Sequence, residues 1–563
     1  MSTADWLVLA GTLLSIVIFG VYRNRQQKNL DAYLLGNKSL NWWRVGFSVM
    51  ATQASAITFL SAPGLAYTDG MRFVQFYFGL PLAMIFICVF FLPIYHRLKV
   101  YTAYEYLESR FDLKTRSLTA LLFLTQRGLA AGITIYAPSI VLSSLLGWNI
   151  YWTNLFMGGL VILYTVSGGS KAVSLTQLQQ LFVIFTGMFV AGYMAVKLLP
   201  DDTGFSDALM VAGSMGKTHV ITTGFDWNDR YNIWSGLIGG FFLALSYFGT
   251  DQSQVGRYLS GKSLGEMRSG LLMNGMLKIP MQFLILLIGA LVFAFYQFHP
   301  APVFFNNGEL QKVRTSDQAA AFSEIEKQQQ QLSVLREEKS HELIRAIHEK
   351  DEQLEKTAKE DLKQLDAKGK QLRTDAIAII KKSNPAADAN DTNYIFLNFV
   401  LEYLPHGLIG LLIALVFCAS WNSTTAELSS LASTTVVDIY KRSVNRSASD
   451  GHYVFASRVA TVIWGFFAIA VAMIANQLGS LIEAVNILGS LFYGTILGVF
   501  LTAFFLKRVS GHAVFAAAIF SELIIILLYF SNAVAFLWLN MIGCALVMFT
   551  SLLLSFYSGT SRK

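Results

Sequence analysis

Long apolar segments separated by short polar loops run along nearly the whole chain. Each is long enough to cross the roughly 30 Å hydrocarbon core of a bilayer as a helix. These segments lie at 5–22, 42–68, 73–95, 117–145, 150–167, 176–199, 232–256, 270–297, 398–434, 454–474, 478–506, 511–530 and 534–556. The pattern predicts an all-α polytopic membrane protein with about 13 transmembrane helices.

One early span is unusually polar for a transmembrane helix. Residues 51–64 read ATQASAITFLSAPG, and the helix is expected to break at Pro63-Gly64. Its polar side chains are those of Thr52, Gln53, Ser55, Thr58 and Ser61. Hydrocarbon cannot hydrogen-bond free backbone carbonyls, so a broken helix at membrane depth must line a cavity or bind a ligand. In secondary transporters such breaks supply carbonyl oxygens to a cation near the bilayer midplane.

A late span is also rich in short side chains that carry oxygen. Within 408–437 these are Ser420, Asn422, Ser423, Thr424, Thr425, Ser429, Ser430 and Ser433. Hydroxyls can bond back to their own helix, which explains the residues from Ser429 onward. Back-bonding accounts less well for the fact that the early span 51–64 and this late span are both polar at membrane depth. Sodium is a hard cation that prefers oxygen ligands, so carbonyls of one segment and side chains of the other would suit it.

Residues 298–391 interrupt the apolar pattern. From Ala319 to Lys382 the composition favours helix, with one glycine and no proline. A thin apolar stripe follows near-heptad spacing, at Ile347, Leu354, Leu365, Leu372 and Ile379. Two interpretations stay open: a solvated helical spacer, or a surface that contacts an extracytoplasmic protein partner. We find no catalytic pattern in this insert.

Composition and charge agree with a membrane location. The 563 residues are 54% hydrophobic and 14% charged, whereas soluble domains carry about 25% charged residues. Residues 308–382 hold 15 basic and 15 acidic residues, so the net charge of +7 belongs to the rest of the chain.

The loop charges orient the predicted spans. Basic residues cluster in alternate short loops, at Arg23, Arg25 and Lys28; Arg97, Lys99, Arg110, Lys114 and Arg116; Arg257, Lys262 and Arg268; Lys441, Arg442 and Arg446; Lys507 and Arg508; and Arg562 and Lys563. This positive-inside pattern predicts an extracytoplasmic N-terminus and insert and a cytoplasmic C-terminus. It argues against a basic face that binds nucleic acid.

The sequence offers no enzyme site. Cys88, Cys418 and Cys544 all lie in apolar segments, which predicts neither a disulfide framework nor a metal site. The eight histidines lie in loops or near helix ends, and none accompanies a nucleophile within a span. The N-terminal run lacks a basic region before it and a cleavage site after it, so it is expected to be a first transmembrane helix in a bacterial inner membrane.

Four motifs together resemble the solute:sodium symporter family. They are ATQASAITFLSAPGLAYTDG (51–70), SGGSKAVSLTQLQQ (167–180), SYFGTDQSQVGRYLSGKS (246–263) and CASWNSTTAELSSLASTTVVDIYKR (418–442). The resemblance implies a LeuT-like core of two inverted five-helix repeats. The implied organisation is an extra N-terminal helix at 1–24, a first repeat at 42–199, a second repeat at 232–297 and 392–506, the helical extracytoplasmic insert at 298–391, and two C-terminal helices with a short cytoplasmic tail at 507–563.

The resemblance also implies a main sodium site. Its ligands would be the carbonyls of Ala51, Ala54 and Ala419 with the side chains of Asn422 and Ser423. Asn422 departs from the family, which usually has a hydroxyl there.

A second cation site found in some members is altered in this chain. Gln177 stands where those members have a carboxylate, and the two hydroxyl positions are Thr425 and Ala426. Glu427 lies next to them, and an acidic group at membrane depth is a functional candidate. Glu427 would serve either cation or proton coupling or a structural ion pair. The simplest expectation is one sodium ion per cycle.

The resemblance places a substrate pocket near the sodium site. The candidate contacts are Thr58, Gln75, Tyr77, Tyr247, Lys278 and Asn486. Tyr247 matches the family's inner-gate tyrosine, although an interfacial aromatic would look the same. Lys278 aligns with a lysine of sugar-transporting members, or it snorkels to the headgroups. Thr58 and Tyr77 replace the glutamine and glutamate of the sugar branch, so a pocket with Lys278 would suit an anion.

The sequence therefore predicts a sodium-coupled symporter, with Na⁺ as coupling ion, that imports a small organic solute by alternating access. The solute classes are an organic acid, an acidic or neutral sugar, or a vitamin-like anion, and membrane lipids surround the protein. A proton-coupled symporter using Glu427 and a transporter-like solute sensor are the alternatives. Only about seven residues follow the last predicted helix, which argues against a sensor with a cytoplasmic output domain.

Overall fold

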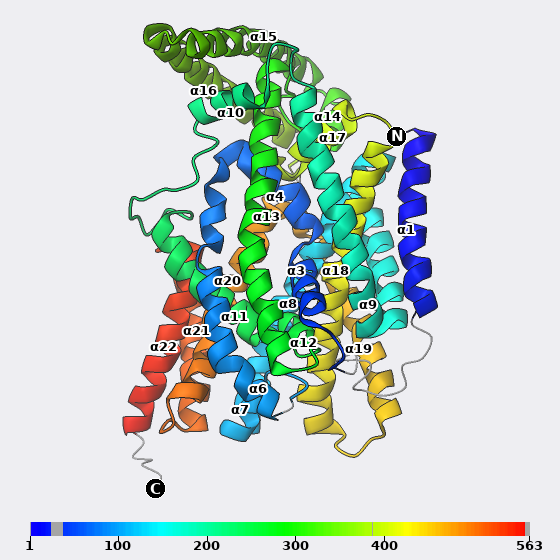
Figure 1. Ribbon diagram of the computed structural model, residues 1–563, viewed down its shortest axis with the longest axis vertical. Coiled ribbons are helices and arrows are strands. Elements are labelled where there is room, and N and C mark those ends of the chain that lie inside the picture. Colours follow the sequence, from blue (N-terminus) through cyan, green and yellow to red (C-terminus); the bar gives the residue numbers. More distant parts are fainter. Residues whose placement is uncertain (1, 24–37, 99, 386, 558–563) are drawn as a thin grey trace.

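The computed structural model describes residues 2–23, 38–98, 100–385 and 387–557. This part of the chain is helical, and its one recorded β contact is an isolated bridge between Leu40 and Gly261. Most helices stand side by side in a bundle, and the hairpin of α15 and α16 lies across one end (Figure 1). The basic positions Arg25, Lys28 and Lys99, the tail after Tyr557, and the side chains of 167–176 and 178 lie outside the described residues.

The helices follow the predicted order. Their bounds are α1 Thr3–Arg23, α3 Trp42–Gln53, α4 Ala56–Asp69, η2 Met71–Tyr77, α5 Leu80–Phe86, η3 Ile87–Phe91, α6 Leu92–Leu98, α7 Glu105–Arg110, α8 Leu113–Leu146, α9 Ile150–Lys197, α10 Phe205–Ser214, η4 Ser235–Gly239, α11 Gly240–Thr250, α12 Gln252–Tyr258, α13 Leu264–Phe298, α14 Asn307–Arg314, α15 Ala319–Glu349, α16 Glu352–Ser383, α17 Thr392–Tyr403, α18 Leu408–Thr434, η5 Thr435–Val444, α19 Asp450–Ala472, η6 Ala475–Gln477, α20 Leu481–Phe505, α21 Gly511–Phe530 and α22 Phe536–Tyr557.

The helical segments fit a membrane protein. In the described chain, nine helices are long and apolar enough to span a bilayer, and the bent pair α3–α4 makes a tenth. Three shorter apolar helices, Thr3–Ser15, Ile150–Val166 and Ser235–Thr250, lie where the sequence predicts further spans. The prediction of an all-α polytopic membrane protein is confirmed.

The early polar span is broken, but not where the sequence predicted. Helices α3 and α4 meet at an angle of 61° across Ala54 and Ser55, whereas Pro63 lies inside α4. Pro63-Gly64 instead marks a close helix contact, because a Cβ on Gly64 would lie 1.9 Å from the carbonyl oxygen of Thr392 on α17. The break therefore falls beside residues whose carbonyls were expected to bind sodium.

The run predicted as a span at 398–434 is two helices. The short helix α17 ends at Tyr403, and α18 begins at Leu408 after Pro405 and a Gly407 with φ of 89°. Proline and a left-handed residue both end a helix, which accounts for the interruption.

The helix α9 contacts α18 at two depths. Near its start, Thr165 bonds Thr425 at 3.3 Å, whereas the later Gly187 lies against Leu412 and Leu415. The second part of α9 thus meets an earlier turn of α18 than the first part does. α9 is one helix in secondary structure, and its two apolar parts, Ile150–Val166 and Gln179–Lys197, lie where the sequence predicts spans at 150–167 and 176–199.

The insert folds as a helical hairpin with its own small core. α15 and α16 turn at Lys350, which has φ of 58°, and Asp351 caps α16 by accepting from the N–H groups of Gln353 and Leu354. Leu332, Leu372 and Ile380 are buried between the two helices and their base.

The insert and the start of α1 lie at the same end of the bundle, called the insert end below (Figure 1). The end of α22 lies at the opposite end (Figure 1). Which end faces the cytoplasm stays a prediction from the loop charges.

Candidate sodium and solute site

A central cavity of about 120 Å³ lies where the two polar spans meet. Residues of the α3–α4 break line it together with side chains from α8, α11, α13, α18 and α20. α18 packs against both halves of the broken helix. The cavity therefore contacts segments that are hundreds of residues apart in the sequence.

The break releases backbone groups at membrane depth. The N–H of Ala54 still bonds the carbonyl of Met50 at 3.0 Å, which closes the last turn of α3. Ser55 is extended, with ψ of 168°, and makes no recorded bond to Ala51 in the described chain. The carbonyl of Ala51 is thus available to a ligand, as helix ends generally are.

The facing turn of α18 supplies side-chain oxygens. Ser423 lines the cavity and donates to the carbonyls of Ala419 and Ser420 at 3.1 and 3.2 Å, which leaves its lone pairs free to accept a cation. Asn422 is 2% exposed, and its amide nitrogen has no partner among the described residues. The residues predicted for the main site are all buried on the two packed segments, and their oxygens fit a hard cation such as sodium.

Two of the residues predicted for a second cation site bond side chains on other helices. Gln177 accepts from Ser48 on α3 at 2.6 Å, and Thr425 bonds Thr165 on α9. Glu427 lies two residues from Thr425, on another side of α18, and faces the central cavity.

Glu427 belongs to a buried charge network on the cavity wall. Arg127 on α8 donates to Glu427 at 3.0 Å, to Tyr493 on α20 at 2.5 Å, and to Asp251. Tyr493 donates in turn to Asp251 at 2.8 Å. The side chains of Arg127, Asp251 and Glu427 are 3%, 0% and 8% exposed, so a single cation faces two carboxylates away from bulk water.

Asp251 marks a second break in the bundle. It separates α11 from α12, and its carboxylate accepts from the N–H and hydroxyl of Ser253 at 2.8 and 2.6 Å. The two broken spans, α3–α4 and α11–α12, are the first helices of the two predicted repeats. Such paired interruptions commonly flank the binding site of a secondary transporter.

Sequence reasoning missed Arg127, Asp251 and Tyr493. A lone arginine within the apolar stretch of α8 was a usable signal, because charged residues at membrane depth are costly and usually functional. Asp251 lies inside the motif at 246–263, which gave it no role.

Five of the six predicted substrate contacts line the cavity: Thr58, Tyr77, Tyr247, Lys278 and Asn486. Lys278 is 1% exposed, and its ammonium lies 5.4 Å from the centre of the Tyr77 ring. No carboxylate of the described chain pairs with it. Tyr247 accepts a hydrogen bond from Gln254 at 2.6 Å, and its ring lies 5.4 Å from the Arg127 guanidinium.

The sixth, Gln75, is not at the cavity. It is fully buried, and its amide donates to the carbonyl of Tyr231 at 2.9 Å and accepts from the N–H of Thr222 at 3.0 Å. Gln75 therefore fastens η2 to the segment that precedes η4, and its amide is already bonded on both sides.

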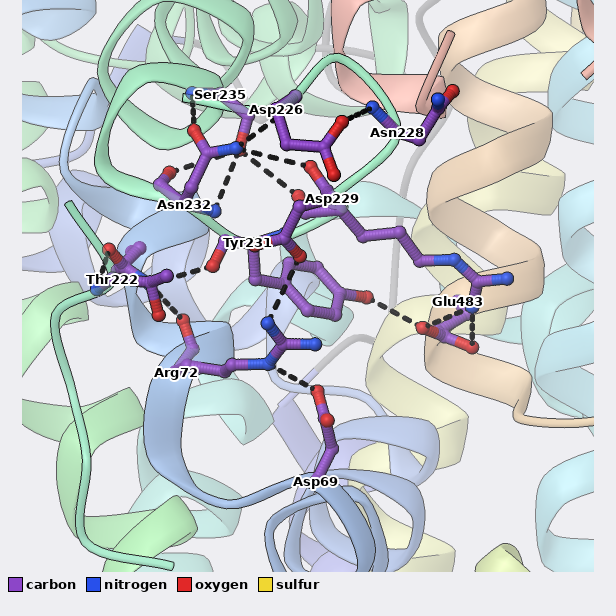
Figure 2. Close-up of polar contacts among 12 residues, drawn as sticks. Asp69, Arg72, Thr222, Asp226, Asn228, Asp229, Tyr231, Asn232, Ser235 and Glu483 are labelled. Carbon is purple, nitrogen blue, oxygen red and sulfur yellow. Dashed lines mark hydrogen bonds and ion pairs between the residues drawn. The ribbon is translucent and has the colours of Figure 1, made fainter. Parts of the chain in front are cut away.

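A polar vestibule of about 360 Å³ lies towards the insert end from the cavity. Figure 2 shows Arg72 pointing to Asp69 and Asp229, at 2.9 and 3.0 Å, and Tyr231 pointing to Glu483 on α20, at 2.9 Å. Arg230 also holds Glu483, through two bonds of 3.0 Å. Between vestibule and cavity, Ser61 on α4 and Ser480 before α20 bond at 3.1 Å.

Lys217 bonds Thr68, which lines the vestibule. Its ammonium donates to the carbonyl of Thr68 at 2.6 Å and lies 4.8 Å from the ring of Phe293. Burial lowers the pKa of Lys217 to about 8, with nearby Asp366 opposing the shift.

These features define a class of protein. Two broken spans meet at a small cavity lined by polar and apolar side chains inside a helical membrane bundle, with a polar vestibule on one side, which is the architecture of a secondary transporter.

Comparison with known proteins gives the family. The chain matches the sodium:solute symporter family over residues 33–326 and 369–521, and it belongs to that family. It is thus a sodium-linked membrane transporter and not an enzyme. The unmatched stretch between the two parts falls inside the hairpin of α15 and α16.

Several relatives cover much of the chain. The sodium/sialic acid symporter SiaT of Proteus mirabilis is 24% identical over 96% of this chain and 92% of its own length. The sodium/glucose cotransporter of Vibrio parahaemolyticus is 25% identical over 91% and 82%. The human sodium-coupled monocarboxylate transporter 1 is 32% identical over 48% of this chain and 44% of its own length.

A solved structure confirms the fold. The substrate-bound, outward-open form of a Na⁺-coupled sialic acid symporter superposes with a TM-score of 0.75 at 23% identity, over 99% of this chain and 98% of that one. The predicted LeuT-like architecture is thereby confirmed.

Proposed function

We propose that this protein imports a small organic anion together with sodium, and that Lys278 receives the anion's negative charge. The observation that carries the proposal is the charge distribution around the cavity. Arg127 is paired with both Asp251 and Glu427, whereas Lys278 has no carboxylate partner in the described chain. A buried, unpaired ammonium is costly, and an anionic solute would compensate it.

Sodium would bind at the break between α3 and α4. Its proposed ligands are the carbonyls of Ala51, Ala54 and Ala419 and the side chains of Asn422 and Ser423. An ion there would tie the broken helix to α18. The solute would contact α4 through Thr58, α13 through Lys278 and α20 through Asn486, so both ligands would act on the same broken helix.

The network around Glu427 supports a structural role for this residue over proton coupling, because its carboxylate already bonds Arg127. Sodium dependence measured at fixed pH separates the two functions. Transport that follows pH and ignores sodium would favour the proton-coupled alternative.

We infer that the insert end faces the extracytoplasmic side, from the positive-inside pattern of the loops. A partner protein for the insert stays a prediction. Val334 and Leu335 on α15 are exposed apolar residues there, at 61% and 45%.

Uptake into sodium-energised proteoliposomes tests the solute class. A labelled panel would include organic acids, acidic sugars and neutral sugars, with choline replacing sodium as the control. Lys278→Gln should lower anion uptake about 10- to 100-fold, since hydrogen bonds to charged groups contribute about 1.5–3 kcal/mol. Lys262→Gln, which alters an exposed lysine before α13, should have no effect. A preferred neutral sugar whose uptake survives Lys278→Gln would contradict the proposal.

A further inference from the structure

A second, apolar cavity lies on the side of the bundle, away from the central site. It has a volume of about 590 Å³ and lies between the later part of α9 and the middle of α13, with Phe205 of α10 at one end. Its lining is almost wholly hydrocarbon and aromatic, and Phe59 of α4 forms part of it. Phe59 is 1% exposed, whereas Phe189 and Leu284 on the rim are 77% and 57% exposed. The groove is therefore open to the outside of the bundle and reaches inward to α4.

The dimensions of this groove match one leaflet of a bilayer. Its lining residues run from Phe185 to Val196 on α9 and from Met281 to Leu291 on α13. At 1.5 Å per residue these stretches are about 15–17 Å long, which is half of the roughly 30 Å hydrocarbon core. On α13 the groove begins three residues after Lys278, at the level of the central cavity, and continues towards the insert end.

The groove ends in residues suited to the headgroup level. Lys197 is exposed at the end of α9, and its ammonium lies 5.9 Å from the ring of Tyr193, which lines the groove. Paired aromatic and basic residues of this kind are typical of the membrane interface. A cation at the mouth of an apolar, leaflet-long groove is complementary to the phosphate of a phospholipid.

We propose that this groove is a binding site for one acyl chain of a phospholipid in the leaflet at the insert end, with the lipid phosphate held near Lys197. The surrounding medium on this face is lipid, so burying the chain against protein is favoured by packing and not by exclusion of water. The bound chain contacts Phe59, five residues after Ala54. We further infer that the lipid stabilises the orientation of α4 that sodium requires. This inference rests on the proposed sodium site.

Filling the groove tests the lipid site directly. Gly192 borders the groove, and a Cβ there would lie 3.2 Å from Cγ1 of Ile288. Gly192→Leu therefore places a side chain in the space proposed for the acyl chain. Gly159→Leu is the matched control on the same helix, because a Cβ at Gly159 meets nothing within 4 Å. Leu284→Trp fills the groove from its exposed rim and serves if Gly192→Leu does not fold.

Native mass spectrometry of the purified full chain counts retained phospholipid. The wild type and Gly159→Leu should each keep one phospholipid through mild delipidation, and Gly192→Leu and Leu284→Trp should lose it. Lys197→Gln should reduce the preference for phosphatidylglycerol over phosphatidylethanolamine. Equal retention in all variants would overturn the proposal. So would a wild-type dimer that Gly192→Leu converts to a monomer, since a second copy would then occupy the groove.

Sodium-dependent thermal stabilisation tests the link to α4. Adding phosphatidylglycerol to delipidated protein should lower the half-saturating sodium concentration several-fold in the wild type and not in Gly192→Leu. If phosphatidylglycerol lowered the half-saturating sodium concentration equally in the wild type and in Gly192→Leu, the proposed effect of the lipid on α4 would be overturned. The lipid site itself would still be decided by mass spectrometry. Absence of any sodium effect would contradict the proposed sodium site instead.

Discussion

At the scale of single residues, chemistry at membrane depth depends on which polar atoms are already bonded. Ser423 uses its hydroxyl proton on its own helix and keeps its lone pairs, whereas both sides of the Gln75 amide are bonded. These two polar residues look equally suitable in the sequence. Only the contacts separate a candidate ligand from a structural clamp.

Replacing sodium ligands should weaken the sodium response. Ser423→Ala removes one proposed oxygen and should raise the half-saturating sodium concentration about tenfold, equivalent to about 1.4 kcal/mol. Asn422→Ser should preserve sodium dependence, because a hydroxyl replaces the amide oxygen. Ser433→Ala is the matched control, since that hydroxyl only bonds its own helix, to the carbonyl of Ser430 at 3.0 Å. The measurement is the uptake rate as a function of sodium concentration. An unchanged dependence in Ser423→Ala would count against the proposed sodium site.

At the scale of elements, helix breaks and their contacts shape the site. The vestibule joins the segment before η4 to the start of α20 through Arg230, Tyr231 and Glu483. The same stretch of α20 continues into Asn486, which lines the cavity. We therefore infer that this contact must separate when the cavity opens towards the insert end.

Breaking this contact should favour opening at the insert end. The side chain of Arg230 is 55% exposed and that of Glu483 is 17% exposed. Exposed ion pairs contribute about 0.2–1 kcal/mol to stability. Glu483→Gln should therefore shift the opening equilibrium no more than about fivefold. The readout is maleimide labelling of an Asn486→Cys reporter from that side. Asn228→Ala, an exposed neighbour, should leave the labelling rate unchanged.

A charge swap distinguishes the ion pair from a general disturbance. Arg230→Glu combined with Glu483→Arg should return labelling towards the wild-type rate, whereas each single change should not. Failure of the swap together with normal folding would show that the pair does not hold the cavity closed.

At the scale of the whole molecule, the bundle and the insert are distinguishable. The family match stops inside α15 and resumes inside α16, while the base of the hairpin has its own core. Yet Leu343 and Leu362 in the outer part of the hairpin are buried with the main core. The hairpin is therefore an addition that packs back onto the bundle.

Shortening the hairpin should lower stability and spare transport. Residues 333–368 can be replaced by three glycines, because Leu332 and Gly369 lie side by side. A Cβ on Gly369 would lie 3.2 Å from Cδ2 of Leu332. We expect a lower melting temperature, since buried contacts of Leu343 and Leu362 are lost, and an uptake rate near the wild type. Loss of uptake in a shortened variant that still folds would assign the hairpin a role in transport.

The proposed coupling also predicts how uptake responds to voltage. One sodium ion carried with a monovalent anion moves no net charge, so a tenfold sodium gradient, about 1.4 kcal/mol, supports about tenfold accumulation. A neutral solute would gain a further 2.3 kcal/mol or so per 100 mV. Uptake under imposed potassium diffusion potentials should therefore be insensitive to voltage. Strong stimulation by an inside-negative potential would indicate a second cation or a neutral solute.

The sequence by itself determined the membrane class, the succession of spans, the helical insert and the two polar segments, because each depends on local composition and periodicity. It placed five of six substrate candidates at one cavity through the family resemblance.

Only the tertiary structure decided where the early span breaks, how Arg127 joins Asp251 and Glu427, and why Gln75 lies elsewhere. Those contacts join residues 124 to 300 positions apart. The break falls at Ala54-Ser55, where no strong helix breaker stands, and not at Pro63-Gly64, because packing against distant helices outweighs local propensity.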